Sequence, residues 1–513
     1  MNDFPPPLRS VWRSLLWKEW HEHKWKLASL TALVVAVPTI IGFWGVDSYL
    51  LMAAMTVTAC YCLLAGTFVG MSTAGSEAGR GTLPFLQSLP VPMWKPGTVK
   101  LLIALATVVL PLFALLVVFC VWWTFAWFGG TLSLYEPWEL QVPGPWGIQN
   151  RLAGTTLSGV IGVSSLLLWM ATAGMNRSDE IRSGAIGFLV VCFVWFVLAT
   201  GLELAVRREL TSLKYGLEVL CAAAPGGAAF VGRDTRPLEH LGWWPHLFAA
   251  LLGHTWLLNL YLRRFGKVVP GTSRRTDEAS PQRAGGYQHL APPMRSQLTA
   301  VAWKQMRETG PLALLAVLGV LVATAAVWMA DFRSKTADEL GNVLGGITMS
   351  VCFFVTLVTG IGVFLEDSKP RVEDFWRSRP VNHSLWFSVK FLVGALILAL
   401  SFGLLMLLAL WLTDGDLLRS ENNPGAAVAF VILLFVLIYT LAMATFCALR
   451  QPLYAAVLTI GLLLGGMFLA QLAFDYFEIS SGKAGWALLL FSQIAATTLA
   501  WQAVKRNWHI AAS

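Results

Sequence analysis

The sequence predicts an all-α polytopic membrane protein, and three observations carry that prediction. Of its 513 residues, 56% are hydrophobic and only 13% are charged, whereas a soluble domain carries about 25% charged residues. Apolar segments recur along the whole chain, and about twelve reach the roughly 20 residues that a helix needs to cross a bilayer. A polar stretch between two apolar segments of the first half also returns, in the same setting, in the second half.

Each predicted span is an apolar run bounded by polar or charged residues. The spans are expected at about 27–46, 50–74, 98–128, 153–174, 185–205, 246–262, 311–330, 343–365, 389–413, 425–448, 453–473 and 484–502. A shorter apolar run at 217–232 is broken by Pro225, Gly226 and Gly227. A run of this length suits a re-entrant or interfacial segment better than a crossing.

The segment before the first span has a pattern of its own. Apolar and charged residues occupy opposite sides of a predicted helix over 8–26, which is typical of a helix lying in the membrane interface with its tryptophans at headgroup level. An ordinary charged tail is the alternative. A shift of 286 positions places a similar segment before the seventh span. The residues assigned to the two interfacial helices are Trp12, Trp17, Lys18, Glu19, Trp303 and Lys304.

The repeated polar stretch organises the chain. It runs from Glu77 to Lys100, and a shift of 290 positions places Asp367 under Glu77 and Lys390 under Lys100. We therefore predict a first six-span unit at 1–265, a linker at 266–293 and a second six-span unit at 294–513. Because each unit has an even number of spans, the two repeats are parallel and their pseudo-twofold axis follows the membrane normal.

The distribution of charge predicts the orientation. If the N-terminus is cytosolic, most of the 37 Lys and Arg residues lie on the cytosolic side, as the positive-inside rule requires. Both termini, the linker and both polar stretches are then cytosolic. Attraction to anionic lipid headgroups accounts for the net charge of +8, so we expect membrane lipids as partners and no nucleic acid.

No motif for catalysis is present. The chain has no phosphate-binding loop, no H-E-x-x-H and no G-x-S-x-G, so we expect no enzyme activity, no metal and no bound cofactor. The sulfurs of Cys60 and Cys62 would point about 200° apart on a helix and are interpreted as small apolar filler. The spans lack the row of carboxylates that a coupled carrier needs. His254 and Asn259 are expected to hydrogen-bond between helices.

Several residues together resemble a known family. They are Trp17-Lys18-Glu19, Glu77, Gly81-Thr82-Leu83, Leu86, Ser88-Leu89-Pro90-Val91 and Lys100. In this order they are similar to the membrane subunits of ATP-binding-cassette (ABC) transporters of the type-two exporter family. The resemblance implies that the N-terminal helix is the elbow and that a coupling helix follows the second span. It also implies that each six-span unit docks on one ATPase subunit, two in all, and that 217–232 is the family's re-entrant element.

The resemblance implies a set of ATPase-coupling residues in each half. Phe85, Leu86 and Leu89 would supply the apolar face of the first coupling helix, with charges at its start. The full set is Glu77, Arg80, Phe85, Leu86, Leu89, Pro90, Asp367, Arg371, Phe375, Trp376 and Pro380. In the second half Arg371-Val372-Glu373 replaces Gly81-Thr82-Leu83, so we expect unequal docking with the first stretch as the stronger contact.

The transported substrate is less sharply predicted. Hydroxyl side chains in the second span and its counterpart either line a pathway or hydrogen-bond between helices. These pathway candidates are Thr56, Tyr61, Thr67, Thr348 and Thr356. A pathway with so few charges suits a lipidic or amphiphilic cargo, exported across the cell (cytoplasmic or inner) membrane. Two other functions remain open: a secondary carrier of the major facilitator type, and a membrane scaffold that transports nothing.

Overall fold

All regular elements that the structure describes are helical. The computed structural model describes residues 8–43, 50–79, 83–88, 91–128, 145–175, 180–230, 244–267, 297–330, 337–365, 367–368, 382–413, 424–477 and 481–506. The chain divides into two compact units, Met1–Val269 and Pro270–Ser513. This division falls within the predicted linker 266–293, most of which lies outside the described residues.

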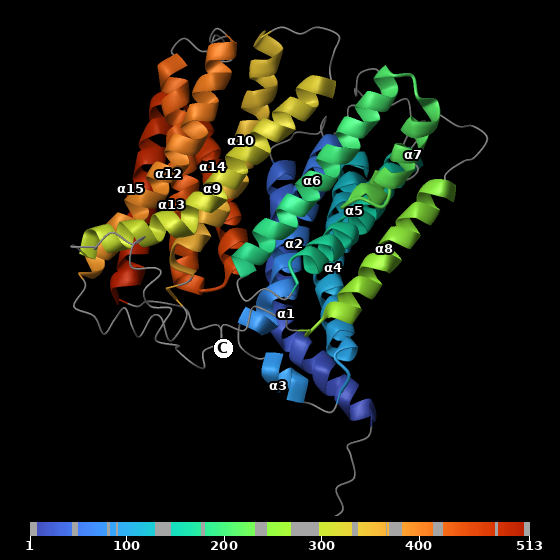
Figure 1. The fold of residues 1–513 in the computed structure, drawn as a ribbon. Helices are drawn as coiled ribbons and strands as arrows, with labels where there is room; N and C mark the ends of the chain where they lie inside the picture. Colours follow the sequence, from blue (N-terminus) through green and yellow to red (C-terminus); the bar gives the residue numbers. More distant parts are fainter. Residues whose placement is uncertain are drawn as a thin grey trace, which may run out of the picture. The chain divides into compact units, whose positions relative to one another are not determined.

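The helices of each unit follow one another as a bundle (Figure 1). The first unit contains α1 (Leu8–Phe43), α2 (Leu50–Gly79), α3 (Leu83–Ser88), α4 (Trp94–Phe128), α5 (Pro145–Ala173), α6 (Glu180–Arg207), α7 (Thr211–Cys221), the 3-10 turn η2 (Gly227–Phe230) and α8 (Trp244–Arg264). The second unit contains α9 (Gln297–Ala330), α10 (Ala337–Leu365), α12 (His383–Leu412), α13 (Pro424–Leu449), α14 (Pro452–Phe477) and α15 (Ser481–Arg506). Each of the twelve predicted spans falls on one of these helices.

Eight helices in the described part of the chain are long and apolar enough to cross a membrane. They lie at Trp94–Val121, Ala153–Ala173, Ile186–Val206, Leu298–Ala325, Leu340–Leu365, His383–Leu412, Ala429–Leu449 and Gly485–Arg506. The apolar stretches Val57–Thr73 and Pro452–Gly466 are shorter. The protein is therefore a polytopic α-helical membrane protein.

The outer faces of these helices are as apolar as their buried faces. In α12, Leu396, Leu400 and Leu404 are exposed at four-residue spacing, while Leu398 and Phe402 between them are buried. A soluble helix would place polar residues on its outer face. An apolar outer face is what a hydrocarbon environment requires.

Glycines allow the closest helix contacts in each unit. In the first unit α2 packs most extensively on α5, and in the second α10 packs most extensively on α13. A Cβ added at Gly70 of α2 would lie 2.6 Å from Met170 Cβ, and one added at Gly360 of α10 would collide with the Tyr439 carbonyl and with Ala442. Small residues bring membrane helices together in this way because van der Waals packing drives their association.

The predicted interfacial helix 8–26 is the first part of α1 and continues without a break into the first predicted span. No Gly or Pro occurs in α1 before Pro38, so nothing interrupts the helix. Glu19, His23 and Lys26 face inward and are buried, whereas Arg13, His21 and several tryptophans are exposed. In α9, Pro311 lies within the helix, and Figure 1 shows the first part of α9 at an angle to the rest.

Candidate functional site at the polar end of each unit

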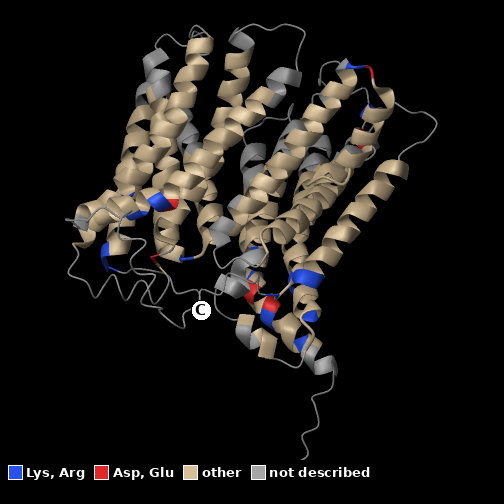
Figure 2. Ribbon diagram, viewed as in Figure 1, with Lys and Arg blue, Asp and Glu red and all other residues tan. Residues whose placement is uncertain are grey.

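Charged side chains gather near the helix ends of each unit and are nearly absent from the helix middles (Figure 2). In the first unit this charged end includes the start of α1, with the uncharged helix α3 near it, and a smaller charged group lies at the turn between α6 and α7. In the second unit it includes the first part of α9. We name the two charged ends the polar junctions. Junction 1 comprises Lys18, Glu19, Glu22 and Lys100, and junction 2 comprises Lys304, Glu308, Asp367 and Lys390.

Junction 2 is a four-residue ion cluster that joins three helices. The Asp367 carboxylate follows the end of α10 and contacts both Lys304 Nζ from α9 and Lys390 Nζ from α12. Glu308 lies 3.6 Å from Lys304 Nζ and 3.8 Å from Lys390 Nζ. Two positive and two negative charges thus balance one another. The cluster ties the first part of α9 to the loop end of α10 and to the start of α12.

Lys390 depends on this cluster because it is fully buried. Its side chain has 0% exposure and that of Asp367 has 1%. The ammonium also donates a hydrogen bond of 2.8 Å to the Val363 carbonyl and lies 5.3 Å from the centre of the Phe364 ring. A buried charge of this kind is stable only where partners replace its lost hydration.

Three residues of junction 1 have counterparts in junction 2. The shift of 286 relates Lys18 and Glu22 to Lys304 and Glu308, and the shift of 290 relates Lys100 to Lys390, whereas Glu19 aligns with Gln305. Lys18 Nζ lies 3.2 Å from Glu19 Oε1 and 3.8 Å from Glu22 Oε1. Lys100, at the start of α4, is buried like Lys390 at the start of α12. Glu77 lies near the end of α2, but its side chain is outside the described residues.

The short helix α3, where the coupling helix was predicted, is held by its neighbours. Leu86 is buried, and Gln87 Nε2 donates a 2.6 Å hydrogen bond to the carbonyl of Gly266, just beyond α8. Gly266 has a φ of +73°, a left-handed conformation that favours glycine. Phe265 next to it packs on Gly97 of α4, where an added Cβ would lie 3.0 Å from the ring. Gln87 thus links α3 to the end of α8, and Phe265 links that end to α4.

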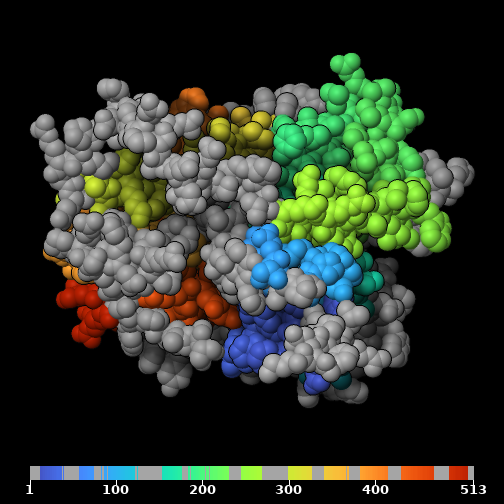
Figure 3. All heavy atoms as spheres, turned by 60° about the horizontal axis from the view of Figure 1, so that its bottom comes forward, coloured from blue at the N-terminus to red at the C-terminus, as the bar shows by residue number. Residues whose placement is uncertain are grey.

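The surface beside α3 is an open hollow of about 560 Å³. Its lining includes Gln87, Trp94, Arg263 and Lys267. Figure 3 shows α3 and the start of α4 in light blue between dark-blue α1 and lime α8. The predicted interfacial residue Trp12 meets Trp94 edge to face, with ring centres 6.2 Å apart. This face combines aromatic, amide and basic groups that a protein partner could contact.

The structure describes only some of the predicted coupling residues. Leu86 and Asp367 are both buried, and Asp367 forms ion pairs with two lysines of its own unit. The side chains of Glu77 and Phe85 are not described, although both residues lie in helices. Arg80, Leu89, Pro90, Arg371, Phe375, Trp376 and Pro380 lie outside the described residues. Sequence reasoning missed Lys26 and Gln305, which are buried polar residues on the inner faces of α1 and α9.

No known protein family matches this chain, and no curated protein sequence does. Its function therefore has to be inferred from its residues and their geometry. Within the described residues no three His, Cys, Asp or Glu side chains gather as a metal site would require.

The predicted re-entrant element is a helix, a turn and a 3-10 segment that pack inside the first unit. α7 packs on α6 and α8, and η2 packs on α5. At the break between α7 and η2, backbone groups lack helical hydrogen-bond partners, and side chains of α5 and α6 hydrogen-bond to them instead. Trp169 Nε1 donates to the Ala223 carbonyl at 3.1 Å, and Trp195 Nε1 donates to the Pro225 carbonyl at 2.9 Å. Irregular backbone at membrane depth is tolerated where such partners exist.

Ser165 of α5 is central to this network. Its Oγ accepts the Gly226 N–H at 2.9 Å, lies 3.3 Å from the Ala224 carbonyl, and lies 2.6 Å from His254 Nε2. His254 Nδ1 is 2.7 Å from the Ala250 carbonyl. A neutral imidazole with its proton on Nδ1 fits both contacts, donating to Ala250 and accepting from Ser165. His254 thus forms the interhelix hydrogen bond expected from the sequence.

Replacing Ser165 with alanine should lower the stability of the first unit by about 1–3 kcal/mol, because the Gly226 N–H and His254 would lose a buried partner. Thermal unfolding in detergent measures this effect. Ser164→Ala is the matched control, since Ser164 Oγ bonds only the Val160 carbonyl of its own helix, and we expect a change within about 0.5 kcal/mol. Equal effects of the two substitutions would show that the network does not hold the break.

The pathway candidates fall into two groups. Tyr61 donates a 2.8 Å hydrogen bond to the Val108 carbonyl of α4, which fits a role in helix packing, and Thr67 is buried. Thr348 and Thr356 line a cavity in the second unit. The side chain of Thr56 is outside the described residues.

Proposed function

We propose that this chain is the membrane component of an ABC transporter that exports a lipidic or amphiphilic cargo across the cell membrane. Separate ATPase subunits would dock on α3 and on the corresponding stretch from Asp367 to Lys390. ATP binding and hydrolysis would take place in these partners, because the chain has no phosphate-binding loop.

The observation that carries the proposal is the way α3 is fixed to the helices around it. Its Gln87 is bonded to Gly266 at the end of α8, and Phe265 there packs against Gly97 of α4. A force applied to α3 would reach the end of α8 through Gln87, and from there α4 through Phe265. Transmission through packed, rigid elements is what an external motor requires.

The proposal includes twelve spans in two parallel six-span repeats, with both termini in the cytosol. Matched positions support the repeat. Lys18 and Glu22 correspond to Lys304 and Glu308, with the same four-residue spacing between lysine and glutamate. Extensive packing of α1 on α4 and of α2 on α5 is matched by α9 on α12 and α10 on α13. These correspondences favour fusion of two equivalent six-span subunits.

The polar junctions give the elbow helices a mechanical role in this proposal. In junction 2 the cluster around Asp367 links the first part of α9 to the start of α12. Movement of a docked ATPase would then be shared between the elbow helix and the third span of the unit. Since Asp367 is buried, other residues of the stretch from Asp367 to Lys390 would make the contact with the partner.

Purification of the full chain from its own membranes in mild detergent tests the proposal. We expect a second protein with a G-x-x-x-x-G-K-[ST] phosphate-binding loop, identified by mass spectrometry, and ATP hydrolysis in the eluate. An unrelated membrane protein carrying the same affinity tag is the control. An eluate of intact, monodisperse chain with no nucleotide-binding subunit would contradict the proposal.

A further inference from the structure

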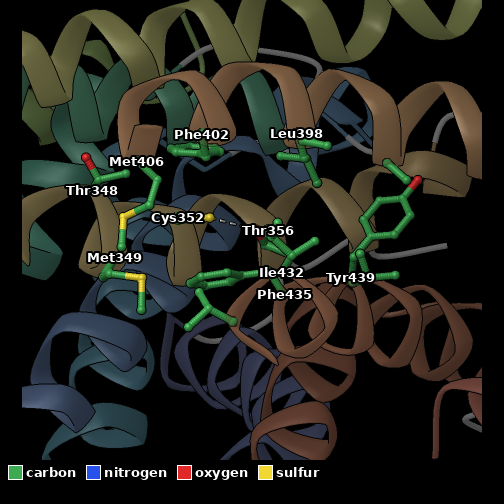
Figure 4. A pocket seen from close by; sticks show the side chains of 15 residues that line it. Thr348, Met349, Cys352, Thr356, Leu398, Phe402, Met406, Ile432, Phe435 and Tyr439 are labelled. Carbon is green, nitrogen blue, oxygen red and sulfur yellow. Dashed lines mark hydrogen bonds between the residues drawn. The ribbon is translucent and has the colours of Figure 1, made fainter. Parts of the chain in front are cut away.

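The second unit contains a cavity of about 100 Å³ between α10, α12 and α13 (Figure 4). Part of the wall that α12 forms consists of the small residues Ala395, Ala399 and Gly403, which recur at four-residue spacing. A Cβ added at Gly403 would meet no atom within 4 Å. Ala399 is exposed and stands beside Leu400, whose exposed fraction is 56%. The cavity therefore opens beside an exposed apolar face of α12, of the kind that hydrocarbon covers in a membrane protein.

The interior of the cavity is apolar apart from one end. Tyr439 and Thr348 lie at opposite ends (Figure 4), with Phe402 and Phe435 among the walls between them. The Tyr439 hydroxyl donates to the Phe391 carbonyl at 3.3 Å, so its polar atom is satisfied. Thr348 is 1% exposed, and its hydroxyl makes no hydrogen bond in the part of the chain that the structure describes.

The corresponding place in the first unit is packed. A shift of 290 positions relates Thr348 to Thr58 and Cys352 to Cys62. There Gly159 brings the backbone of α5 against both side chains: an added Cβ would lie 2.6 Å from Thr58 Cγ2, and Cys62 Sγ donates to the Gly159 carbonyl at 3.3 Å. The same types of residue are thus compatible with close packing of two helices in the first unit, whereas the second unit has a cavity at this place.

We propose that this cavity binds the end of a hydrocarbon chain of a membrane amphiphile, which enters from the bilayer across Ala399. An apolar cavity of about 150 Å³ holds one benzene molecule, so about 100 Å³ admits a short piece of chain. The cavity is too small for another helix to insert one of its faces. Lipid tails surround the opening, and apolar walls exclude polar ligands. This inference does not depend on an ATPase partner.

Photolabelling of the full chain tests the inference. The chain is reconstituted in phosphatidylcholine vesicles that contain a phospholipid with a diazirine near the end of one acyl chain. After irradiation, mass spectrometry locates the label. We expect labelled peptides around Thr348–Thr356 of α10 and around Phe435 of α13. Gly403→Leu fills the open space and should reduce this labelling at least fivefold, whereas Gly319→Leu, also with open space at its Cβ, should not change it.

Labelling confined to outward residues such as Leu404 and Trp411 would overturn the inference, and so would full labelling of the cavity residues in Gly403→Leu. Protection of the cavity by a second protein chain, detected as a crosslinked pair, would also overturn it and indicate a partner helix. If Gly403→Leu does not fold, the smaller Gly403→Ala should reduce labelling about twofold.

A free fatty acid with the same diazirine should label the same peptides if the hydrocarbon chain alone is recognised. Labelling by the phospholipid alone would show that the headgroup places the chain.

Discussion

Replacing Asp367 with alanine is expected to lower the free energy of unfolding of the second unit by about 3–5 kcal/mol, the usual cost of removing one partner from a buried ion pair. The substitution leaves Lys390 fully buried beside Lys304, and of the two carboxylates of junction 2 the more distant Glu308 remains. Thermal or denaturant unfolding in detergent measures the change.

Glu308→Gln provides the comparison, because Glu308 is 26% exposed and lies 3.6–3.8 Å from both lysines; we expect about 1 kcal/mol or less. The double substitution Asp367→Leu with Lys390→Met should recover much of the loss, since an apolar pair can replace a buried ion pair. Equal losses for Asp367→Ala and Glu308→Gln would contradict the cluster described for junction 2.

Replacing Leu86 with aspartate is expected to release α3 from its packing and to uncouple ATP hydrolysis from the chain. Burial of a leucine side chain stabilises by roughly 2 kcal/mol, so its loss lowers the ratio of packed to released α3 about 30-fold. The rate of backbone hydrogen exchange in residues 83–88 should therefore rise about 30-fold. Stimulation of ATP hydrolysis in the proposed partner should decrease in the same variant.

Ser88→Asp adds the same charge at an exposed position of α3 and is the matched control for Leu86→Asp. It should leave hydrogen exchange of the segment unchanged. If both variants exchange alike, Leu86 does not anchor α3.

The positions of the helices could be predicted from the sequence because long apolar runs reflect the bilayer directly. Every predicted span falls on a helix, and the helix break near Pro225 is present where expected. The inward direction of Glu19 and His23 could not be predicted. A helical pattern shows that two faces differ, but in the membrane interface either face can meet lipid, and only contacts such as His23 with Thr107 of α4 decide between them.

The coupling role of the repeated polar stretch stays a prediction. The shift that aligns Glu77 with Asp367 and Lys100 with Lys390 identified residues near helix ends, with Asp367 just after α10 and Lys390 in the first part of α12. It did not reveal that Asp367 pairs with Lys390 within its own unit, because a repeated charge pattern looks the same for internal and external partners. The hydrogen-bonding role of Ser165 could not be predicted, because a single serine in an apolar span is common.

Site-specific photo-crosslinking at α3 tests the central claim most directly, that an ATPase docks on this helix. The substitution Ser88→benzoylphenylalanine places the probe on its exposed surface, and Thr211→benzoylphenylalanine places the same probe on exposed α7, at the other end of the first unit (Figure 1). Irradiation of native membranes should join position 88, and not position 211, to a nucleotide-binding subunit. Crosslinks to such a subunit from position 211, or from neither position, would contradict the proposed docking site.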